Sequence, residues 1–332
     1  MHTDYLLEVH DLKTGFTTDE GQALAVNGVS LTVKPGEIVG LVGESGSGKS
    51  VTGFSIMRLI EEPGRIVGGQ IVYKGQNLLD LTEKQMRQLR GNRIAMIFQD
   101  PMMTLNPVLR IDTQMIETLQ AHEKISRKEA RLRAAQALAL MGVPSPEERS
   151  TAYPHQLSGG MRQRVAIAIA LLLKPDLIIA DEPTTALDVT IQAQILAEIQ
   201  KLAQESGTAL IWITHDLSVV AGLADRLAVM YAGKIVETGT IDQVLAHPQH
   251  PYTEGLINSL PSNNPRGQRL RQIKGMTPSL FDLPSGCAFA ARCERAQPKC
   301  AQEPALAELV PEHAVRCFYP SASLQPAVKE ML

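Results

Sequence analysis

The sequence lacks an apolar run long enough to cross a membrane as a helix. Such a helix needs ~20 predominantly apolar residues, and the longest candidate, residues 165–173, is much shorter and ends at Lys174. The first residues include Asp4 and Glu8 and contain no apolar core, which excludes a secretory signal. We therefore expect a cytosolic chain that reaches a membrane only through a partner.

Aromatic residues and cysteines are also few, and the net charge is small. Aromatic residues make up 4% of the chain, and the net charge is −3. This small charge gives no electrostatic reason to expect nucleic acid as a partner. The most basic run, residues 124–133, contains acidic residues at helical spacing and is typical of a solvated helix face. The four cysteines all lie between residues 287 and 317. Since a reducing compartment disfavours disulfides, this cluster needs another explanation.

The pattern along the 332 residues predicts an α/β fold with one large core and an appendage. Short apolar runs separated by turn signals predict a small antiparallel sheet over residues 5–42 and hairpins at 66–75 and 226–237. A helical pattern from about 111 to 142 interrupts the α/β order and predicts an inserted helical subdomain. Continuous apolar runs predict buried strands at 38–42, 94–98, 177–181 and 209–214.

The stretch 43–50 reads G-x-x-x-x-G-K-S between a predicted strand and a predicted helix over 51–60. Backbone N–H groups of such a loop converge on phosphate oxygens, with Lys49 reaching the β- and γ-phosphates and Ser50 ligating Mg²⁺. The alternative is a chance glycine-rich turn before a helix. The expected nucleotide-binding residues are Gly43, Ser45, Gly46, Ser47, Gly48, Lys49, Ser50 and Val51.

Two further strands end in polar residues that suit phosphate chemistry. Asp181 and Glu182 end one buried strand, where Asp181 is placed to hold Mg²⁺ through water and Glu182 to deprotonate an attacking water. The alternative is an acidic turn that caps a helix. His215 follows another buried strand, at the same edge of the predicted sheet, and is placed for a γ-phosphate.

Two weaker candidates complete the site. Ser158, Gly159 and Gly160 precede a predicted helix over 162–173, which makes a second anion site of the same physical kind, although Ser-Gly-Gly alone is a common helix start. Phe16 is one of few aromatic residues. It either stacks on an adenine ring or packs into the sheet.

In this order, these elements resemble the nucleotide-binding subunit of an ABC transporter over residues 5–260. The resemblance implies that two such subunits pair head to tail, with ATP between the phosphate loop of one and the Ser-Gly-Gly helix start of the other. It implies that Gln99 contacts Mg²⁺ and senses the membrane partner, that Asp188 bridges the two sites, and that Glu182 and His215 support hydrolysis. Phe16 falls near the adenine-stacking aromatic of that family.

A closer resemblance is to the ATP-binding subunits of dipeptide, oligopeptide and nickel importers. It rests on residues 99–107, 188–190 and 250–253, on the cysteine-bearing tail, and on Met161, where other ABC subunits usually carry Gln. It implies a P-loop NTPase core with an N-terminal β-subdomain, in which residues 1–260 are the ATPase domain, about 100–165 its helical subdomain, and 261–332 a Cys-rich extension. It also implies four partners at the cytoplasmic face of the inner membrane: a second, related ATPase subunit, two transmembrane permeases and an extracytoplasmic peptide-binding protein.

The cysteines Cys287, Cys293, Cys300 and Cys317 are spaced C-x5-C-x6-C-x16-C in a stretch that is poor in large apolar residues. A metal would substitute for the missing core. The spacing lacks the C-x2-C pairs of zinc ribbons, and four thiolates suit a [4Fe–4S] cluster equally well. The importer subunits that the chain resembles carry such a cluster, so iron–sulfur is favoured over zinc, and free thiols come third.

Three functions are compatible with these features. The first is the ATPase motor of an importer for di- or oligopeptides, with nickel as the alternative cargo. The second is a soluble ABC ATPase that acts on ribosomes or DNA, but such proteins usually carry two ATPase units or a long coiled-coil insertion, and this chain has one phosphate loop and no long heptad run. A binding module without catalysis is third, because Glu182 and His215 are both present.

Overall fold

The computed structural model describes residues 4–19, 21–184, 189–264, 267 and 269–321. The chain divides into two compact units. The ranges given for each unit also span the residues that the structure does not describe. Unit 1 comprises residues 1–7, 32–38 and 72–213, and unit 2 comprises residues 8–31, 39–71 and 214–332. None of the helices within the described ranges is long and apolar enough to span a membrane.

The sheet of unit 1 is parallel and buried. Its strands β6 (Ile94–Ile97), β7 (Leu177–Asp181) and β8 (Ala209–Thr214) lie in the order β8-β7-β6. Every residue of these three strands is buried, as expected for parallel strands covered on both faces. Helix α6 (Gly159–Leu171) packs against β6, and α7 (Val189–Ser206) connects β7 to β8. The strands predicted at 177–181 and 209–214 are confirmed, and the one predicted at 94–98 is one residue shorter.

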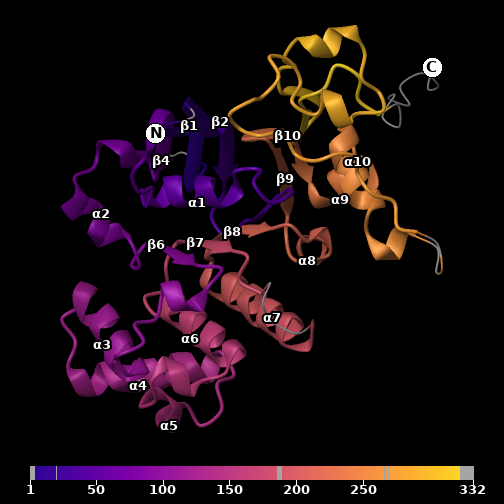
Figure 1. Cartoon of the computed structure of the whole chain (residues 1–332). Helices are drawn as coiled ribbons and strands as arrows, with labels where there is room; N and C mark the ends of the chain where they lie inside the picture. The colour runs from indigo at the N-terminus through magenta and orange to yellow at the C-terminus, as the bar shows by residue number, and fades with distance from the viewer. Residues whose placement is uncertain (1–3, 20, 185–188, 265–266, 268, 322–332) are drawn as a thin grey trace, which may run out of the picture. The chain divides into compact units, whose positions relative to one another are not determined.

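A helical block in unit 1 consists of α6 with α3 (Ile111–His122), α4 (Arg127–Leu140) and α5 (Pro146–Ser150). The last three helices contact one another (Figure 1). The predicted helical pattern over 111–142 thus contains two helices, α3 and α4. The break has a local cause, because the Ser126 hydroxyl accepts a hydrogen bond from the backbone N–H of Glu129 at 3.2 Å and so caps a new helix. Unit 1 also contains α2 (Glu83–Leu89) and the short β5 (Gln76–Asn77).

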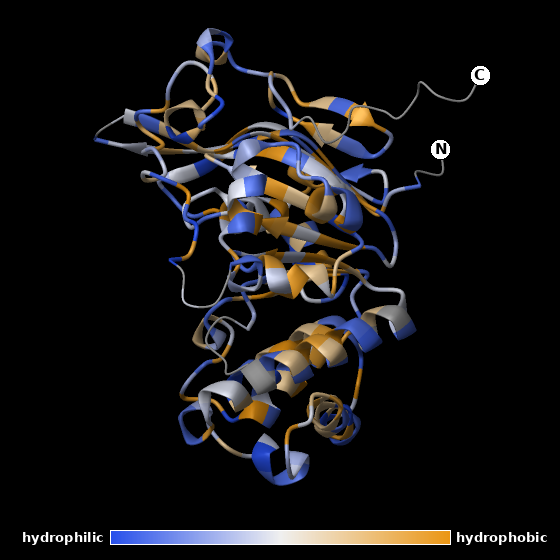
Figure 2. Cartoon of the chain, turned by 90° about the vertical axis from the view of Figure 1, so that its right-hand side faces the viewer, coloured by the Kyte–Doolittle hydropathy of each residue, from blue (hydrophilic) through white to orange (hydrophobic). Residues whose placement is uncertain are grey.

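Unit 2 has two sheets. One contains β2 (Gly21–Val33), β1 (Leu7–Thr18) and β4 (Gly64–Tyr73) in that order. The other has the order β11-β12-β10-β9-β3, where β3 (Ile38–Val42) runs parallel to β9 (Arg226–Tyr231), and β9 forms the predicted hairpin with β10 (Lys234–Thr240). In Figure 2 the strands are largely orange, which shows the hydrophobic residues that build the cores.

The C-terminal extension joins this second sheet. Strands β11 (Ala307–Val310) and β12 (His313–Val315) form an antiparallel pair, and β12 pairs with β10. The rest of the extension consists of loops and short 3₁₀ turns (Figure 1, yellow). The helices of unit 2 are α1 (Lys49–Met57), α8 (Leu217–Ala221), α9 (Ile241–Ala246) and α10 (Pro251–Asn258). Helix α1 begins two residues before the predicted helix and ends earlier, where Arg58 takes a left-handed conformation.

Candidate active site

The glycine-rich loop lies in unit 2 between β3 and α1, as predicted. Gly48 precedes the first residue of α1 with φ of 102°, a conformation that favours glycine. A Cβ at this position would lie 2.2 Å from the carbonyl oxygen of Ala25, so no other residue fits without moving backbone. Ser47 and Lys49 are buried, whereas Ser45 and Gly46 at the tip of the loop are exposed. The exposed tip and the helix start together form an anion-binding cradle.

The Lys49 ammonium group is held inside this loop. It donates hydrogen bonds to the carbonyl oxygens of Gly43 at 2.8 Å and Glu44 at 3.0 Å, and its side chain also lies 3.4 Å from the Ser47 hydroxyl. Only 5% of Lys49 is exposed. A buried positive charge at the base of an anion cradle fits a phosphate group.

Glu44, inside the loop, is bound by residues that the sequence did not indicate. Its carboxylate forms a bidentate ion pair with Arg292 and accepts a hydrogen bond from the Thr277 hydroxyl at 3.1 Å. Its backbone N–H donates to the Tyr252 hydroxyl at 2.7 Å. The hydrogen bond from Arg292 lowers the pKa of Glu44 below its usual value, against the opposing effect of burial.

The motif at 250–253 positions one of these residues. His250 caps α10, because its Nδ1 accepts the backbone N–H of Tyr252 at 3.1 Å. Burial lowers the pKa of His250 to about 3, which keeps this nitrogen free to accept. Pro251 occupies the first turn, where no backbone donor is needed. In the sequence this motif is a family signature, and in the fold it also places the Tyr252 hydroxyl against the phosphate loop.

Phe16, the candidate adenine-stacking residue, is partly exposed in β1. A Cβ at Gly64 would lie 2.5 Å from its ring, so the ring packs directly on the backbone of β4. The exposed part of the ring remains accessible for stacking. Both interpretations of Phe16 therefore keep a physical basis, and its contact with adenine stays a prediction.

Unit 1 holds Gln99, Asp181 and Glu182. Asp181 is the last residue of β7 and is buried. Glu182 follows with φ of 45°, a left-handed conformation that costs a non-glycine residue roughly 1–3 kcal/mol. Its backbone N–H donates to the carbonyl oxygen of Ile213 at 2.9 Å, which supports that conformation. The Gln99 amide donates to the Glu182 carboxylate at 3.2 Å. Two candidate catalytic residues from different strand ends are thus in contact.

The second helix start also lies in unit 1. Ser158 caps α6, and its hydroxyl accepts the backbone N–H of Met161 at 3.3 Å. Ser158 and Gly159 are exposed, and Gly160 is half-buried. Space within 4 Å of a Cβ at Gly159 is open, so the protomer itself does not require glycine there.

His215 belongs to unit 2, directly after β8, and is exposed. The next residue, Asp216, caps α8 by accepting the Ser218 N–H at 2.8 Å, which fixes the backbone next to His215. Ser50 and Val51 are half-buried in the first turn of α1. Asp188 lies outside the described residues.

The four cysteines Cys287, Cys293, Cys300 and Cys317 line one small cavity, together with aromatic and proline side chains. The backbone N–H of Cys287 donates to the carbonyl oxygen of Cys300 at 2.9 Å, which joins two of the cysteine-bearing turns. Burial, reinforced by repulsion from the neighbouring cysteines, raises the pKa of Cys317 to about 11. No group of three or more His, Cys, Asp or Glu residues in the described part of the chain is arranged to hold a metal ion.

Comparison with known proteins assigns the family. The family model described as ABC transporter matches residues 26–185, and that of the C-terminal region of oligopeptide/dipeptide transporters matches residues 236–300. A probable peptide ABC transporter ATP-binding protein of Sinorhizobium fredii is 51% identical over 95% of this chain and 95% of its own length. The oligopeptide transport ATP-binding protein OppD of Escherichia coli is 46% identical over 97% of this chain and 95% of its own.

Solved structures agree with this assignment. The dimeric structure of an ATP-binding cassette in a post-hydrolysis state, bound to ADP and Pi, matches with a TM-score of 0.65 and 29% identity, over 71% of this chain and 98% of that one. The chain therefore belongs to the ABC transporter ATPases, in the branch of oligopeptide and dipeptide transport ATP-binding proteins.

Proposed function

We propose that this chain is the ATP-hydrolysing motor of an importer that takes up di- or oligopeptides through partner membrane permeases. The observation that carries the proposal is the similarity to peptide transport ATP-binding proteins, which extends over about the whole of both chains. The site residues support it, since an anion cradle with a buried lysine and a carboxylate at a strand end are the parts that ATP hydrolysis needs. The same similarity favours peptides over nickel, the alternative cargo.

ATP binding is assigned to unit 2. The backbone N–H groups and hydroxyls of residues 43–51 bind the phosphates, and Lys49 exchanges its carbonyl partners for phosphate oxygens. Ser50 offers its hydroxyl to Mg²⁺, which neutralises charge on the β- and γ-phosphates when bound. Phe16 stacks on the adenine ring in this proposal.

Hydrolysis is assigned to Glu182 as the general base and to Gln99 as its positioning partner. Their hydrogen bond fixes the carboxylate, and the left-handed backbone aims it. Asp181 holds Mg²⁺ through water, with Gln99 as a further ligand, and His215 contacts the γ-phosphate. The ATPase domain is proposed to be residues 1–260, with a helical subdomain at about 100–165, and residues 261–332 are proposed to form the extension.

A second ATPase subunit is proposed to complete each site. Ser158, Gly159 and Gly160 are accessible at the start of α6, where a nucleotide held by the partner can approach the backbone. Asp188 would bridge the two sites. The partner is proposed to be a related subunit rather than a second copy.

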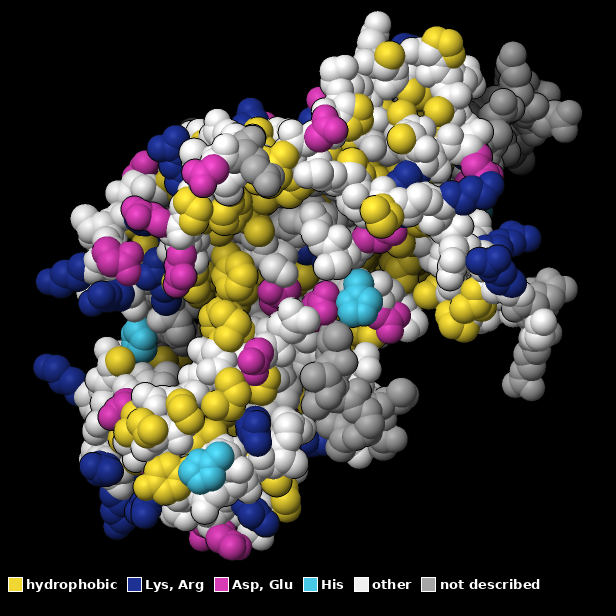
Figure 3. All heavy atoms as spheres, viewed as in Figure 1, with side chains coloured by type: hydrophobic (Ala, Val, Ile, Leu, Met, Phe, Trp, Pro, Cys, Tyr) yellow, Lys and Arg dark blue, Asp and Glu magenta, His cyan; other side chains and the backbone are white. Residues whose placement is uncertain are grey.

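The permeases are proposed to dock on the helical block, beside Gln99. Met103 is 62% exposed and Val108 is 75% exposed in the segment that follows Gln99, and exposed methionine suits a surface that repacks against a helix. Figure 3 shows further hydrophobic patches (yellow) among basic side chains on this block. The chain is accordingly proposed to lie at the cytoplasmic face of the inner membrane, with an extracytoplasmic peptide-binding protein as the fourth partner.

Co-expression with the permeases encoded for the same importer tests the function. In vesicles that contain the complete complex and its binding protein, added di- or oligopeptide should stimulate ATP hydrolysis and be taken up, and Lys49→Ala should abolish both. Peptide-independent ATP hydrolysis by a chain that never co-purifies with permeases would favour the soluble-ATPase alternative. Stimulation by nickel alone would favour the nickel alternative.

We further propose that the cysteine cavity holds a [4Fe–4S] cluster, with zinc as the alternative. The support is that all four cysteines line one small cavity in a loop-rich segment. The thiols would bind as thiolates and would secure the loops around them. Anaerobic purification followed by metal analysis should give about four irons per chain and absorption near 400 nm. One zinc per chain, or no metal, would contradict the iron–sulfur proposal and leave the ATPase assignment intact.

A further inference from the structure

Glu44 is a carboxylate inside a loop that is proposed to bind an anion, and this conflict has a structural solution. The carboxylate is not directed to solvent alone, because Arg292 binds both of its oxygens, with Nη1 at 2.6 Å from Oε2 and Nη2 at 3.0 Å from Oε1. The Arg292 side chain is only 5% exposed, whereas that of Glu44 is 29% exposed. A bidentate ion pair between a carboxylate and a desolvated guanidinium is among the stronger charge interactions in proteins.

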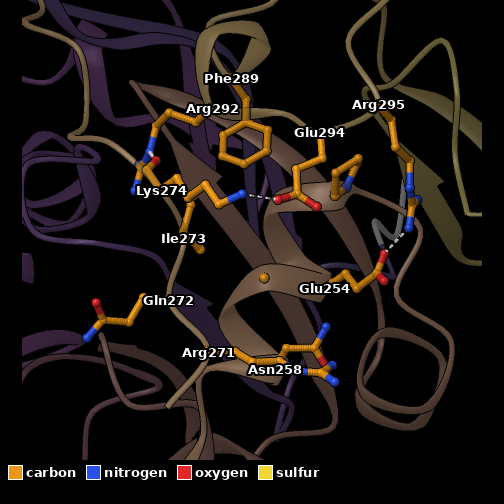
Figure 4. Close-up of a pocket in the computed structure, with 12 residues that line it drawn as sticks. Glu254, Asn258, Arg271, Gln272, Ile273, Lys274, Phe289, Arg292, Glu294 and Arg295 are labelled. Carbon is orange, nitrogen blue, oxygen red and sulfur yellow. Dashed lines mark hydrogen bonds and ion pairs between the residues drawn. The ribbon is translucent and has the colours of Figure 1, made fainter. Parts of the chain in front are cut away.

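Arg292 is itself held in place before any nucleotide arrives. Its Nε donates to the carbonyl oxygen of Lys274 at 2.9 Å, and its guanidinium carbon lies 5.8 Å from the centre of the Tyr231 ring and 5.9 Å from that of Phe289. Figure 4 shows Arg292 and Phe289 at the edge of a cavity of about 540 Å³. These contacts orient the guanidinium plane, so little conformational freedom remains to be lost when it binds Glu44.

Other contacts to Glu44 come from the same part of the chain. Thr277 donates to its carboxylate, and Tyr252 accepts its backbone N–H. Arg292, Thr277 and Tyr252 all lie within residues 236–300, the region that matches the oligopeptide/dipeptide C-terminal family model. That region therefore contacts the phosphate loop at one residue through one ion pair and two hydrogen bonds.

We propose that Arg292 is a positioning residue for ATP: it neutralises Glu44 and holds this carboxylate away from the phosphates, so that the loop presents only positive charge and N–H groups. The inference rests on the proposed ATP site. Without Arg292, an unpaired carboxylate in the loop repels the triphosphate and competes for the Lys49 ammonium, which already binds the Glu44 carbonyl.

The test compares nucleotide affinity and ATP hydrolysis of the assembled complex in four forms. Arg292→Ala should raise both the Kd and the KM for ATP by roughly tenfold, while kcat stays within about twofold, because the hydrolytic residues are untouched. Adding Glu44→Gln to Arg292→Ala should recover most of the affinity, since the repelling charge is gone. Glu44→Gln alone should bind ATP a few-fold more tightly, because the Arg292 charge is then unopposed.

Lys274→Ala is the matched control. Lys274 lines the same cavity, but its side chain forms an exposed ion pair with Glu294 instead of one with the phosphate loop (Figure 4). Its removal should leave the KM within about twofold, as expected for an exposed pair. The control separates the effect of Arg292 from a general loss of charge around the cavity.

The outcomes are distinguishable. A merely structural role of Arg292 predicts that the double variant binds ATP as weakly as Arg292→Ala, and that result would overturn the inference, as would an unchanged KM in Arg292→Ala. Should Arg292→Ala fail to fold, weaker ATP binding by Glu44→Gln would overturn the inference, and tighter binding would support it. Absence of saturable ATP binding in the unmodified complex would contradict the proposed function itself.

Discussion

The chain has two glycine-rich helix starts, one before α1 and one before α6, and they differ in what holds them. The first is built into its own unit: Gly48 has a left-handed backbone against Ala25, Lys49 is buried, and Glu44 is bound by Arg292. The second has an ordinary extended cap at Ser158, with open space around Gly159. Glycine is thus required by the fold in the first loop. In the second it is free for the close approach of a ligand, which is the role proposed for the partner's nucleotide.

Glu182→Gln should have the largest effect, because it separates binding at both helix starts from the chemistry. Loss of the general base is expected to lower kcat by about 10²–10⁴, while ATP still binds at residues 43–51. Steady-state hydrolysis, together with the size of the ATP-bound complex, measures the two separately. Accumulation of a closed ATPase pair would support the assignment, and near-normal turnover would contradict it.

Gly48→Ala tests the first helix start. The added Cβ meets the Ala25 carbonyl oxygen at 2.2 Å in a left-handed conformation. We expect a loss of roughly 3 kcal/mol or more in the free energy of unfolding, which lowers Tm by at least ~5 °C, and a loss of ATP binding. Thermal unfolding and nucleotide titration measure these effects. Normal stability would show that the loop relaxes more easily than its contacts indicate.

Gly159→Ala is the corresponding change in the second helix start. Because nothing lies within 4 Å of the new Cβ, Tm should stay within about 1 °C. ATP affinity of the isolated chain should also be unchanged, whereas hydrolysis by the paired subunits should fall roughly tenfold if a nucleotide approaches this backbone. Hydrolysis at the normal rate in the assembled complex would contradict the proposal that Gly159 allows close approach of a nucleotide, whereas Gly48 is required by the fold.

The smallest expected effect is a difference in acid stability between two ion pairs of unit 2. The pKa of Glu44 is lowered from its usual 4.5, so its pair with Arg292 stabilises the folded state fully above about pH 4.5 and loses that contribution as pH falls below it. Tm measured from pH 7 to pH 3.5 should therefore fall less for Glu44→Gln than for the unmodified chain. Glu294→Gln is the control, because its pair with Lys274 is exposed and should contribute little.

Features encoded by neighbouring residues were predictable from the sequence. The phosphate loop lies between a strand and a helix as predicted, and the strand that ends in Asp181 and Glu182 has the predicted bounds. Each depends on a run of fewer than about ten residues whose apolar period or glycine content is visible directly. The break between α3 and α4 has such a signal as well, since Ser126 and Glu129 form a capping pattern.

The contacts that hold Glu44 in place were not predictable in the same way. It joins position 44 to positions 252, 277 and 292, and no periodicity connects single Tyr, Thr and Arg residues across more than 200 positions. Strands β11 and β12 were missed because they are short and lie in a proline-containing tail without clear alternation. Their pairing with β10 is a tertiary interaction that overrides weak local preference.

The buried pair between Glu237 and His313 joins β10 to a strand that the ribosome synthesises much later. Both side chains are fully buried, and the Glu237 carboxylate also accepts the backbone N–H groups of Gln249 and His250 at the start of α10. Until the ribosome has released β12, this carboxylate keeps its two backbone donors but lacks its histidine partner. We expect the pair between Glu237 and His313 to form only after residue 313 has left the exit tunnel, and chains stalled behind linkers of increasing length fused after residue 332 measure that point.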